Sequence, residues 1–272
     1  MEAAVSATDK EFTGSIPEFY DRFFVPLIFE PYAIDIARRL VALRPNRILE
    51  VAAGTGAVTR AVAASLPETE IVATDLNQAM IDHAKRRQSG GRVSWQTADA
   101  QALPFDEATF DAVVCQFGAM FFPDKVKAYK EARRVLKSGG CFLFNVWDKI
   151  ADNEFADIVT QALAEMFPGD PPLFMARTPH GHHDIARIRA DLEAAGFSHI
   201  STEAKDERSK APSARDVAVA YCEGSPLRNE IEARDKVRLQ EATSRATAAI
   251  ERRFGTGPVD GRIRAIIITA LH

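Results

Sequence analysis

The chemically most informative stretch of the sequence is the run Leu-Glu-Val-Ala-Ala-Gly-Thr-Gly at residues 49–56. An apolar strand there runs into a turn of small residues, and a helical stretch follows. Gly and Ala let a ligand approach the backbone closely, and the start of a helix offers free N–H groups and a positive dipole end. A plain tight turn between a strand and a helix explains the same residues, so the run needs support from elsewhere in the chain.

Two acidic residues supply that support. Asp75 ends the second apolar run, nineteen residues after Gly56, and Asp99 follows the third run. In open α/β sheets an acid at the end of the second strand accepts hydrogen bonds from ribose hydroxyls. A carboxylate at the end of the third strand can reach an adenine amino group. Each acid alone is also explained as a cap of the next helix. Three such features at three successive strand ends indicate a nucleotide site.

A nicotinamide cofactor and S-adenosylmethionine are the two ligands to be compared. The dinucleotide fingerprint requires a third Gly where the helix packs against the strand, and this chain has Thr59 there. Glu50, just before the turn, favours a cationic part of the ligand over a pyrophosphate. An acid at the third strand adds recognition of adenine without any need for phosphate. The residues therefore favour S-adenosylmethionine over NAD.

The elements that must position these residues alternate along the chain. Short apolar runs predict strands, and amphipathic stretches between them predict helices, which together indicate a parallel sheet with helices on both faces. The strands are expected at 47–51, 71–74, 93–96, 110–116, 141–147, 199–204 and 263–271, and the helices at 34–43, 59–66, 79–88, 125–136, 154–167, 185–195, 215–221 and 229–254.

Composition narrows the class of protein. The chain has 272 residues, 46% of them apolar, and a net charge of −4, so nothing in it favours binding to nucleic acid. Its three cysteines are too few and too scattered for a disulfide framework or a zinc site, which favours a reducing, cytoplasmic location. No apolar run approaches the ~18 residues of a membrane span, and the start lacks the regions of a signal peptide.

Five ordered blocks within residues 45–148 give the chain a family resemblance. They lie at residues 49–56, 73–77, 98–105, 110–117 and 134–140, and the last reads Arg-Val-Leu-Lys-Ser-Gly-Gly. Together they resemble the class I S-adenosylmethionine-dependent methyltransferases, in the small-molecule branch that includes ubiquinone- and menaquinone-pathway enzymes. One departure is Ala52, where the family usually has its first Gly. We expect Ala52 to adopt a negative φ and binding to survive.

The resemblance implies a three-layer, Rossmann-like α/β sandwich whose seven-stranded, mostly parallel sheet ends in an antiparallel strand at 263–271. It also implies the cofactor-binding residues. Glu50, Ala52, Gly54 and Gly56 would face the methionine part, Asp75 the ribose, Leu76 and Met80 the flanks of adenine, Asp99 and Ala100 the adenine edge, and Gln116 and Phe117 the methyl side.

Three regions are expected in the chain. Residues 1–44 form an N-terminal helical lid, 45–148 the S-adenosylmethionine-binding core, and 149–272 the remainder, with a helical insertion at about 211–260 and the final strand. Tyr20 in the lid is the candidate to bond the methionine carboxylate. His180 and His182, in a Pro-rich loop, are the candidate bases. An exposed loop explains them equally, and no metal site is predicted.

The predicted function is methyl transfer from S-adenosylmethionine to an oxygen, carbon or nitrogen atom of a small, largely apolar acceptor. The partners are then a small molecule and, where the chain self-associates, a second copy of itself. One alternative is a nucleotide-binding or S-adenosylmethionine-binding protein without catalysis, and another is an NAD-dependent oxidoreductase. The sequence does not name the acceptor, because the acceptor contacts come from the lid and the 149–260 region.

Overall fold

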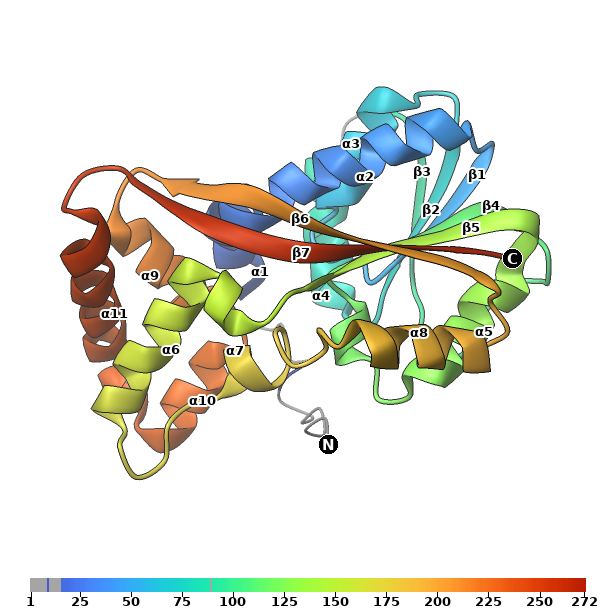
Figure 1. The fold of residues 1–272 in the computed structure, drawn as a ribbon. Coiled ribbons are helices and arrows are strands. Elements are labelled where there is room, and N and C mark those ends of the chain that lie inside the picture. Colours follow the sequence, from blue (N-terminus) through green and yellow to red (C-terminus); the bar gives the residue numbers. More distant parts are fainter. Residues whose placement is uncertain (1–8, 10–15, 89) are drawn as a thin grey trace. The chain divides into compact units, whose positions relative to one another are not determined.

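The computed structural model describes residues 9, 16–88 and 90–272, so residues 1–8 and 10–15 of the predicted lid lie outside the described part. The elements follow each other along the chain (Figure 1) as α1 (Ile16–Phe19), the π-helix η2 (Tyr20–Phe29), α2 (Glu30–Leu43), β1 (Arg47–Val51), α3 (Ala57–Ser65), β2 (Glu70–Asp75), α4 (Gln78–Arg87), β3 (Arg92–Thr97), β4 (Phe110–Gln116), η3 (Ala119–Phe121), α5 (Lys125–Val135), β5 (Leu136–Trp147), η4 (Ile150–Asp152), α6 (Glu154–Met166), α7 (Phe174–Arg177), α8 (Ile185–Ala194), β6 (His199–Ala211), α9 (Ala214–Glu223), α10 (Leu227–Arg234), η5 (Lys236–Arg238), α11 (Leu239–Phe254) and β7 (Val259–Leu271).

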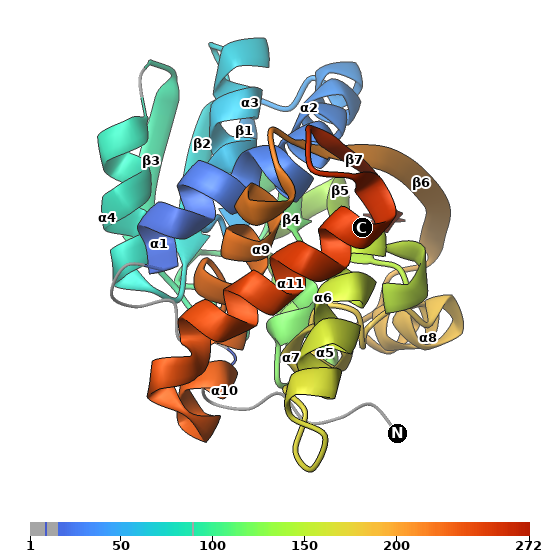
Figure 2. The same ribbon diagram turned by 90° about the vertical axis from the view of Figure 1, so that its left-hand side faces the viewer.

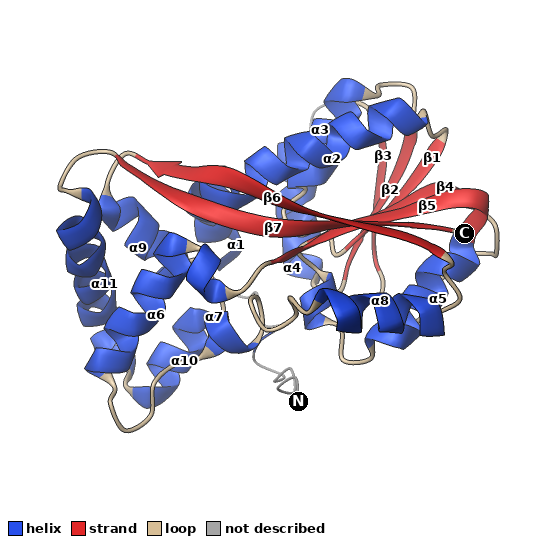
Figure 3. Cartoon of the chain, in the orientation of Figure 1, coloured by secondary structure: helices blue, strands red, loops and turns tan. Residues whose placement is uncertain are grey.

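The seven strands form one sheet in the order β3-β2-β1-β4-β5-β7-β6. The pairs β1–β2, β1–β4, β2–β3 and β4–β5 are parallel. The end of β7 meets the start of β5, since Gly139 N donates to His272 O and His272 N donates to Gly140 O, so β7 runs antiparallel. In Figure 3, α2 and α3 lie on one face of the sheet and α5 and α8 on the other. These observations confirm the predicted seven-stranded α/β sandwich with its last strand reversed.

Burial explains why these runs become strands. Every residue of β1 after Arg47 is buried, and β4 is buried at five of its seven positions, as expected for central parallel strands covered on both faces. β3 lies at an edge and has no fully buried residue. The carboxyl ends of β1, β2 and β4 are therefore held by a rigid, fully packed centre.

The chain divides into two compact units. The sheet unit, as we call it, contains Tyr32–Val146, His182–Lys205 and Ala265–His272. The helical unit contains the residues up to Pro31, Trp147–Gly181 and Asp206–Arg264. The boundaries fall inside β5, β6 and β7, so each of these strands contributes residues to both units.

Helices α6, α9, α10 and α11 make up much of the helical unit (Figure 2), and their contacts are largely apolar and aromatic. Phe24 meets Tyr221 of α9 edge-on, with 4.8 Å between ring centroids, and Phe155 meets Phe254 in the same way at 5.1 Å. No helix in the described part of the chain is both long and apolar enough to cross a membrane.

The N-terminal aromatic segment is helical throughout, although Pro26 lies inside it. The sequence predicts that Pro26 and Pro31 interrupt a helix here, and the interruption takes the form of the π-helix η2. Pro removes an N–H donor and its ring clashes with the carbonyl of the preceding turn. Wider π turns lie mostly as single insertions within α-helices, and here one accommodates the proline without breaking the segment.

Candidate functional site

The turn after β1 has an unusual backbone. Ala52, Gly54 and Gly56 have φ values of +55°, +56° and +82°. The expectation of a negative φ at Ala52 was therefore wrong, because the turn requires a left-handed residue there, and an alanine adopts that conformation at a cost of about 1 kcal/mol. A Cβ atom on Gly54 would enter open space, whereas one on Gly56 would lie 2.7 Å from Cη2 of Trp95. Gly54 thus leaves its backbone accessible, and Gly56 lets the turn pack against β3.

Glu50 is the next-to-last residue of β1 and is 2% exposed. Its Oε2 atom accepts a hydrogen bond of 2.5 Å from Oγ1 of Thr59 in α3. Burial raises the pKa of the Glu50 carboxyl to about 8, because the charged form loses its hydration. A cation placed beside this carboxyl would favour its ionised form, so the site is suited to a positively charged group.

Asp75 joins two loops through its carboxylate. One oxygen accepts from Gly54 N at 2.9 Å and the other from Asn77 N at 2.8 Å. The side chain is nearly buried, and burial raises its pKa. Each carboxylate oxygen has two acceptor positions. Oδ1 also lies 3.5 Å from Nδ2 of Asn77, whereas Oδ2 keeps a position for a ligand hydroxyl beside Gly54 N. Asp75 therefore stabilises the turn after β1 and can still accept from a ligand hydroxyl.

The next two strand ends provide apolar and polar contacts. Leu76 is 55% exposed, although it directly follows the buried Asp75, and Met80 of α4 is buried. An exposed leucine at such a place offers its surface to the face of a flat ring. Asp99 is exposed, and its Oδ1 accepts from Gln101 N at 2.9 Å, as a turn-capping acid does. Ala100 beside it is half-buried.

β4 ends at Gln116, which is half-buried and paired in register with Asn145 of β5. The next residue, Phe117, has a φ of +51° and is 5% exposed. Its ring meets that of Tyr32 edge-on, with 5.3 Å between centroids. Its N–H donates to both the main-chain oxygen and Oδ1 of Asn145, at 3.2 and 3.0 Å.

Backbone hydrogen bonds bring these strand ends together at one edge of the sheet. Ala53 N donates to Thr74 O at 2.9 Å, and Ala98 N donates to Asp75 O at 3.1 Å. The turn after β4 packs against the turn after β1, since a Cβ atom on Gly118 would lie 2.6 Å from Cβ of Ala52. The predicted site residues within the sheet unit therefore lie at the edge formed by the carboxyl ends of the parallel strands. They are Glu50, Ala52, Gly54, Gly56, Asp75, Leu76, Met80, Asp99, Ala100, Gln116 and Phe117.

Tyr20 and His180 belong to the helical unit. The Tyr20 ring stacks on Phe29 at 5.0 Å between centroids. His180 is 4% exposed and its Nδ1 lies 2.8 Å from the main-chain oxygen of Asp148, the residue that follows β5. Because a carbonyl only accepts, Nδ1 donates this hydrogen bond, which orients the imidazole ring.

His182 has a different environment, inside the sheet unit. It is 2% exposed, and its Nε2 lies 3.3 Å from the hydroxyl of Tyr129 in α5. The Tyr129 ring itself packs against Phe142 and Phe144 of β5. His182 is therefore part of the packing between α5 and the sheet. Within the described ranges, no three His, Cys, Asp or Glu side chains are placed to hold a metal ion.

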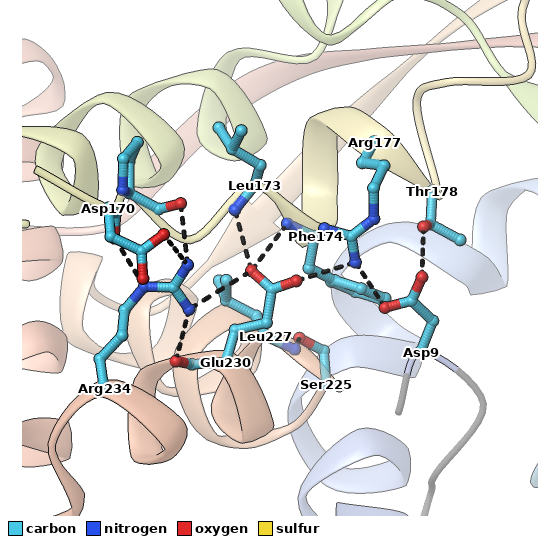
Figure 4. A network of polar contacts seen from close by, with 11 residues as sticks. Asp9, Asp170, Leu173, Phe174, Arg177, Thr178, Ser225, Leu227, Glu230 and Arg234 are labelled. Carbon is cyan, nitrogen blue, oxygen red and sulfur yellow. Dashed lines mark hydrogen bonds and ion pairs between the residues drawn. The ribbon is translucent and has the colours of Figure 1, made fainter. Parts of the chain in front are cut away.

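Arg177 has two carboxylate partners within the helical unit. Its Nη2 atom lies 2.6 Å from Asp9 and 2.8 Å from Glu230 (Figure 4). Asp9 also accepts a 2.7 Å hydrogen bond from Thr178. Glu230 further accepts from the main chain at the start of α7. The guanidinium charge is thus compensated by the protein itself, and Arg177 ties the α7 segment to α10.

The structure adds residues that the sequence reasoning missed. Thr59 is the hydrogen-bond partner of Glu50, Asn145 is the acceptor for Phe117 N, and Gly118 leaves room for Ala52. For Asn145 a signal was present, since it is the one amide side chain in the otherwise apolar run 141–147. Thr59 and Gly118 gave no such signal, because their roles depend on contacts between distant parts of the chain.

Comparison with known proteins agrees with this arrangement. A profile described as "Methyltransferase domain" matches residues 48–140. The ubiquinone/menaquinone biosynthesis C-methyltransferase UbiE of Methylobacterium nodulans is 39% identical over 183 residues, which cover 62% of this chain and 72% of that protein. UbiE of Idiomarina loihiensis is 29% identical over 192 residues, covering 65% and 75%.

A solved structure shares the fold. The YcgJ protein from Bacillus subtilis superposes with a TM-score of 0.55 at 18% identity, covering 89% of this chain and 98% of that one. This chain has the features that the resemblance implies: the sheet topology, the glycine turn after β1 and the acid at the end of β2. With 39% identity across nearly three quarters of a UbiE relative, this chain belongs to the class I S-adenosylmethionine-dependent methyltransferases.

Proposed function

We propose that the protein methylates a ring carbon of a small, largely apolar aromatic acceptor of the quinol type, since its relatives are described as ubiquinone/menaquinone biosynthesis C-methyltransferases. The observation that carries this proposal is the 39% identity to a C-methyltransferase over 183 residues. S-adenosylmethionine supplies a methyl group on a sulfonium, which is transferred in line to the acceptor. The acceptor gains a carbon–carbon bond, the sulfur–carbon bond breaks, and a ring proton leaves to a base.

We assign the cofactor contacts to the shared edge of the sheet unit. Asp75 accepts from the ribose hydroxyls with the lone pairs that Gly54 and Asn77 leave free. Glu50, buried and neutral near pH 7, ionises beside the cationic methionine part. The open backbone at Gly54 supports close approach of the ligand.

The remaining assignments follow the resemblance and the local surroundings. Leu76 and Met80 flank the adenine, Asp99 and Ala100 read its edge, and Gln116 and Phe117 close the methyl side. The exposed surface of Leu76 supports this, since it is the large apolar side chain at this edge that packing leaves accessible. Tyr20 remains the candidate for the methionine carboxylate.

For the base we favour His180 over His182. The hydrogen bond from Nδ1 to Asp148 O supports this choice, because it engages Nδ1 and orients the ring. His182 instead contacts Tyr129, whose ring is part of the core. The base acts on the acceptor, and the rest of the site aligns the reacting atoms and excludes water.

We further propose that the protein works in the cytoplasm, on a small molecule and not on nucleic acid. The three cysteines are free and buried, as in a reducing compartment. The net charge of −4 supplies no field that would attract nucleic acid. Self-association into a homo-oligomer is tested by sedimentation of the purified chain.

The function is tested with S-adenosylmethionine and a soluble 2-prenyl-1,4-naphthoquinol, kept reduced. We expect formation of S-adenosylhomocysteine and of a ring-methylated quinol, identified by mass and by its new C–CH₃ signal in NMR spectra. The Asp75→Ala variant is the control for cofactor-dependent turnover. An O-methyl product would show that the methylated atom is oxygen and would overturn the assignment to carbon. Binding of the cofactor without turnover on quinols and phenols would overturn the proposal as a whole.

A further inference from the structure

Asn145 is an amide side chain in the interior of a central strand. It is 0% exposed, and its neighbours Phe144 and Val146 on β5 are also fully buried. Its Nδ2 atom has no hydrogen-bond partner among the described residues. A buried donor without an acceptor costs about 1–3 kcal/mol, and a leucine of similar volume would avoid that cost. The amide must therefore contribute something at this position that a leucine would not.

Its contribution is a hydrogen bond to a strained residue. Phe117 N donates to Oδ1 of Asn145 at 3.0 Å, in addition to the main-chain oxygen of the same residue at 3.2 Å. Because an N–H group only donates, the oxygen of the amide has to face Phe117 and the Nδ2 atom has to face away. Phe117 has a φ of +51°, a conformation that bulky residues rarely adopt. The amide oxygen is thus one of the contacts that hold this conformation.

The strained turn begins where the predicted methyl side of the site lies. Gln116 is the register partner of Asn145, and Phe117 directly follows it. Strained backbone of this kind persists where surrounding contacts hold it, and it concentrates at functional sites. The Phe117 ring is fixed from its other side by Tyr32.

We propose that Asn145 is a positioning residue, whose Oδ1 holds the Gln116–Phe117 turn against the methionine part of the bound cofactor. This inference rests on the proposed function, since it assumes that the edge of the sheet binds S-adenosylmethionine. It assigns to Asn145 no contact with the reacting atoms. The competing explanation is that Asn145 only fills space in β5.

The test compares two ligands that differ in the methionine part. S-adenosylhomocysteine and adenosine are titrated into the unsubstituted protein and into Asn145→Leu and Asn145→Asp. We expect Asn145→Leu to weaken S-adenosylhomocysteine binding about tenfold and to leave the Kd for adenosine within about twofold. Asn145→Asp keeps an acceptor oxygen in place, and at about pH 6 its buried carboxyl stays neutral. It is therefore expected to bind S-adenosylhomocysteine nearly as well as the unsubstituted protein.

Ser209→Ala is the matched control. Ser209 is also buried in a long strand with a hydroxyl that has no partner in the described part of the chain, but it lies in β6 and is not among the residues assigned to the cofactor. Its removal should change neither ligand affinity. Hydrogen exchange of the Phe117 amide, followed by NMR, should be about tenfold faster in Asn145→Leu and unchanged in Ser209→Ala. If Asn145→Leu does not fold, Asn145→Ser, whose hydroxyl is too short to reach Phe117, replaces it.

The outcomes separate the two proposals. Equal weakening of both ligands, or no weakening of either, in a folded Asn145→Leu variant would overturn the role of Asn145 and leave the proposed function standing. Failure of the unsubstituted protein to bind S-adenosylhomocysteine would overturn the proposed function and this inference with it. Selective weakening in Asn145→Leu together with recovery in Asn145→Asp is the result that we expect.

Discussion

A Cβ atom built on Gly118 would lie 2.6 Å from the Cβ atom of Ala52. It would also lie 2.7 Å from the sulfur of Cys115. Ala52 occupies the position where the family pattern implies Gly, and its methyl group fills the space in front of Gly118. The two residues therefore form a matched pair, in which the glycine after β4 makes room for the alanine after β1.

A double-mutant cycle measures this pairing. Gly118 has a φ of −102°, so alanine suits its backbone, and Gly118→Ala should destabilise the protein by about 2 kcal/mol through overpacking alone. Ala52→Gly should change stability by less than about 1 kcal/mol, because relief of left-handed strain offsets the greater freedom of the unfolded chain. In the double variant we expect about 1 kcal/mol of recovery, measured by urea unfolding. Additive effects would show that the two sites do not share space.

Asp75 should contribute both to ligand binding and to the stability of the turn after β1. Asp75→Ala removes the acceptors for ribose and is expected to weaken S-adenosylhomocysteine binding by about 1–3 kcal/mol. It also leaves Gly54 N and Asn77 N without their acceptor, so the free protein should lose about 1–2 kcal/mol of stability. Calorimetry and urea unfolding measure the two effects. Unchanged affinity in a folded variant would remove Asp75 from the site.

Glu50 predicts a pH dependence of stability. The folded protein holds the proton of this carboxyl up to about pH 8, whereas the unfolded chain releases it near 4.5. Since the unfolded state binds fewer protons in this interval, the free energy of unfolding should fall as the pH rises from about 4.5 to about 8. Glu50→Gln, which stays neutral, should flatten this part of the curve. The same slope in both proteins would contradict the assignment.

The sheet could be predicted well because its information is local. β1 and β4 begin and end at the predicted residues, and β2 and β3 extend one residue further at each end. The strands that the chain reaches later are longer than predicted, since β5 and β7 begin earlier and β6 ends later. The predicted helix at 229–254 is wrong, since Asp235 adopts an extended backbone and its side chain accepts from Val237 N, which separates α10 from α11. An aspartate offers the backbone this alternative partner, and the hydrophobic spacing does not reveal it.

The candidate site was predictable to the extent that its residues lie at strand ends. Asp75 and the glycine turn follow from motif spacing alone. The left-handed backbone of Ala52 and Phe117 could not be predicted, because it depends on how two turns pack against each other. The surroundings of His180 and His182 were equally inaccessible, since each histidine contacts a residue more than thirty positions away in the chain.

The two histidines should differ in their effect on turnover. His180→Gln is expected to lower the rate of methyl transfer about a hundredfold, with cofactor affinity unchanged, because a base is lost. His182→Gln should leave the rate within about twofold and lower the melting temperature, since it alters a contact with Tyr129 inside the core. Rates are measured with the quinol acceptor that the proposed function predicts. A rate loss in His182→Gln alone would reverse the assignment.

Arg177 should contribute to stability through its two carboxylates. Arg177→Met leaves Asp9, which is 1% exposed, next to Glu230 without a cation between them. Because the arginine is partly exposed, we expect a loss of about 2 kcal/mol, less than for a fully buried pair. Asp9→Asn in the Arg177→Met background should recover part of this loss in thermal unfolding. An unchanged melting temperature in Arg177→Met would show that the network adds no stability.

The segment that contains α9, α10 and α11 connects the end of β6 to the start of β7. β6 and β7 are neighbours in the sheet, and Arg208 near the end of β6 bonds both the side chain and the main chain of Asp260 near the start of β7. A short hairpin could therefore join the two strands in place of residues 212–258. The segment can therefore be exchanged as a unit, by grafting the corresponding residues of a relative between Ala211 and Val259. Because the residues assigned to the cofactor keep their sequence in such chimaeras, their product spectrum would test whether this segment determines the acceptor.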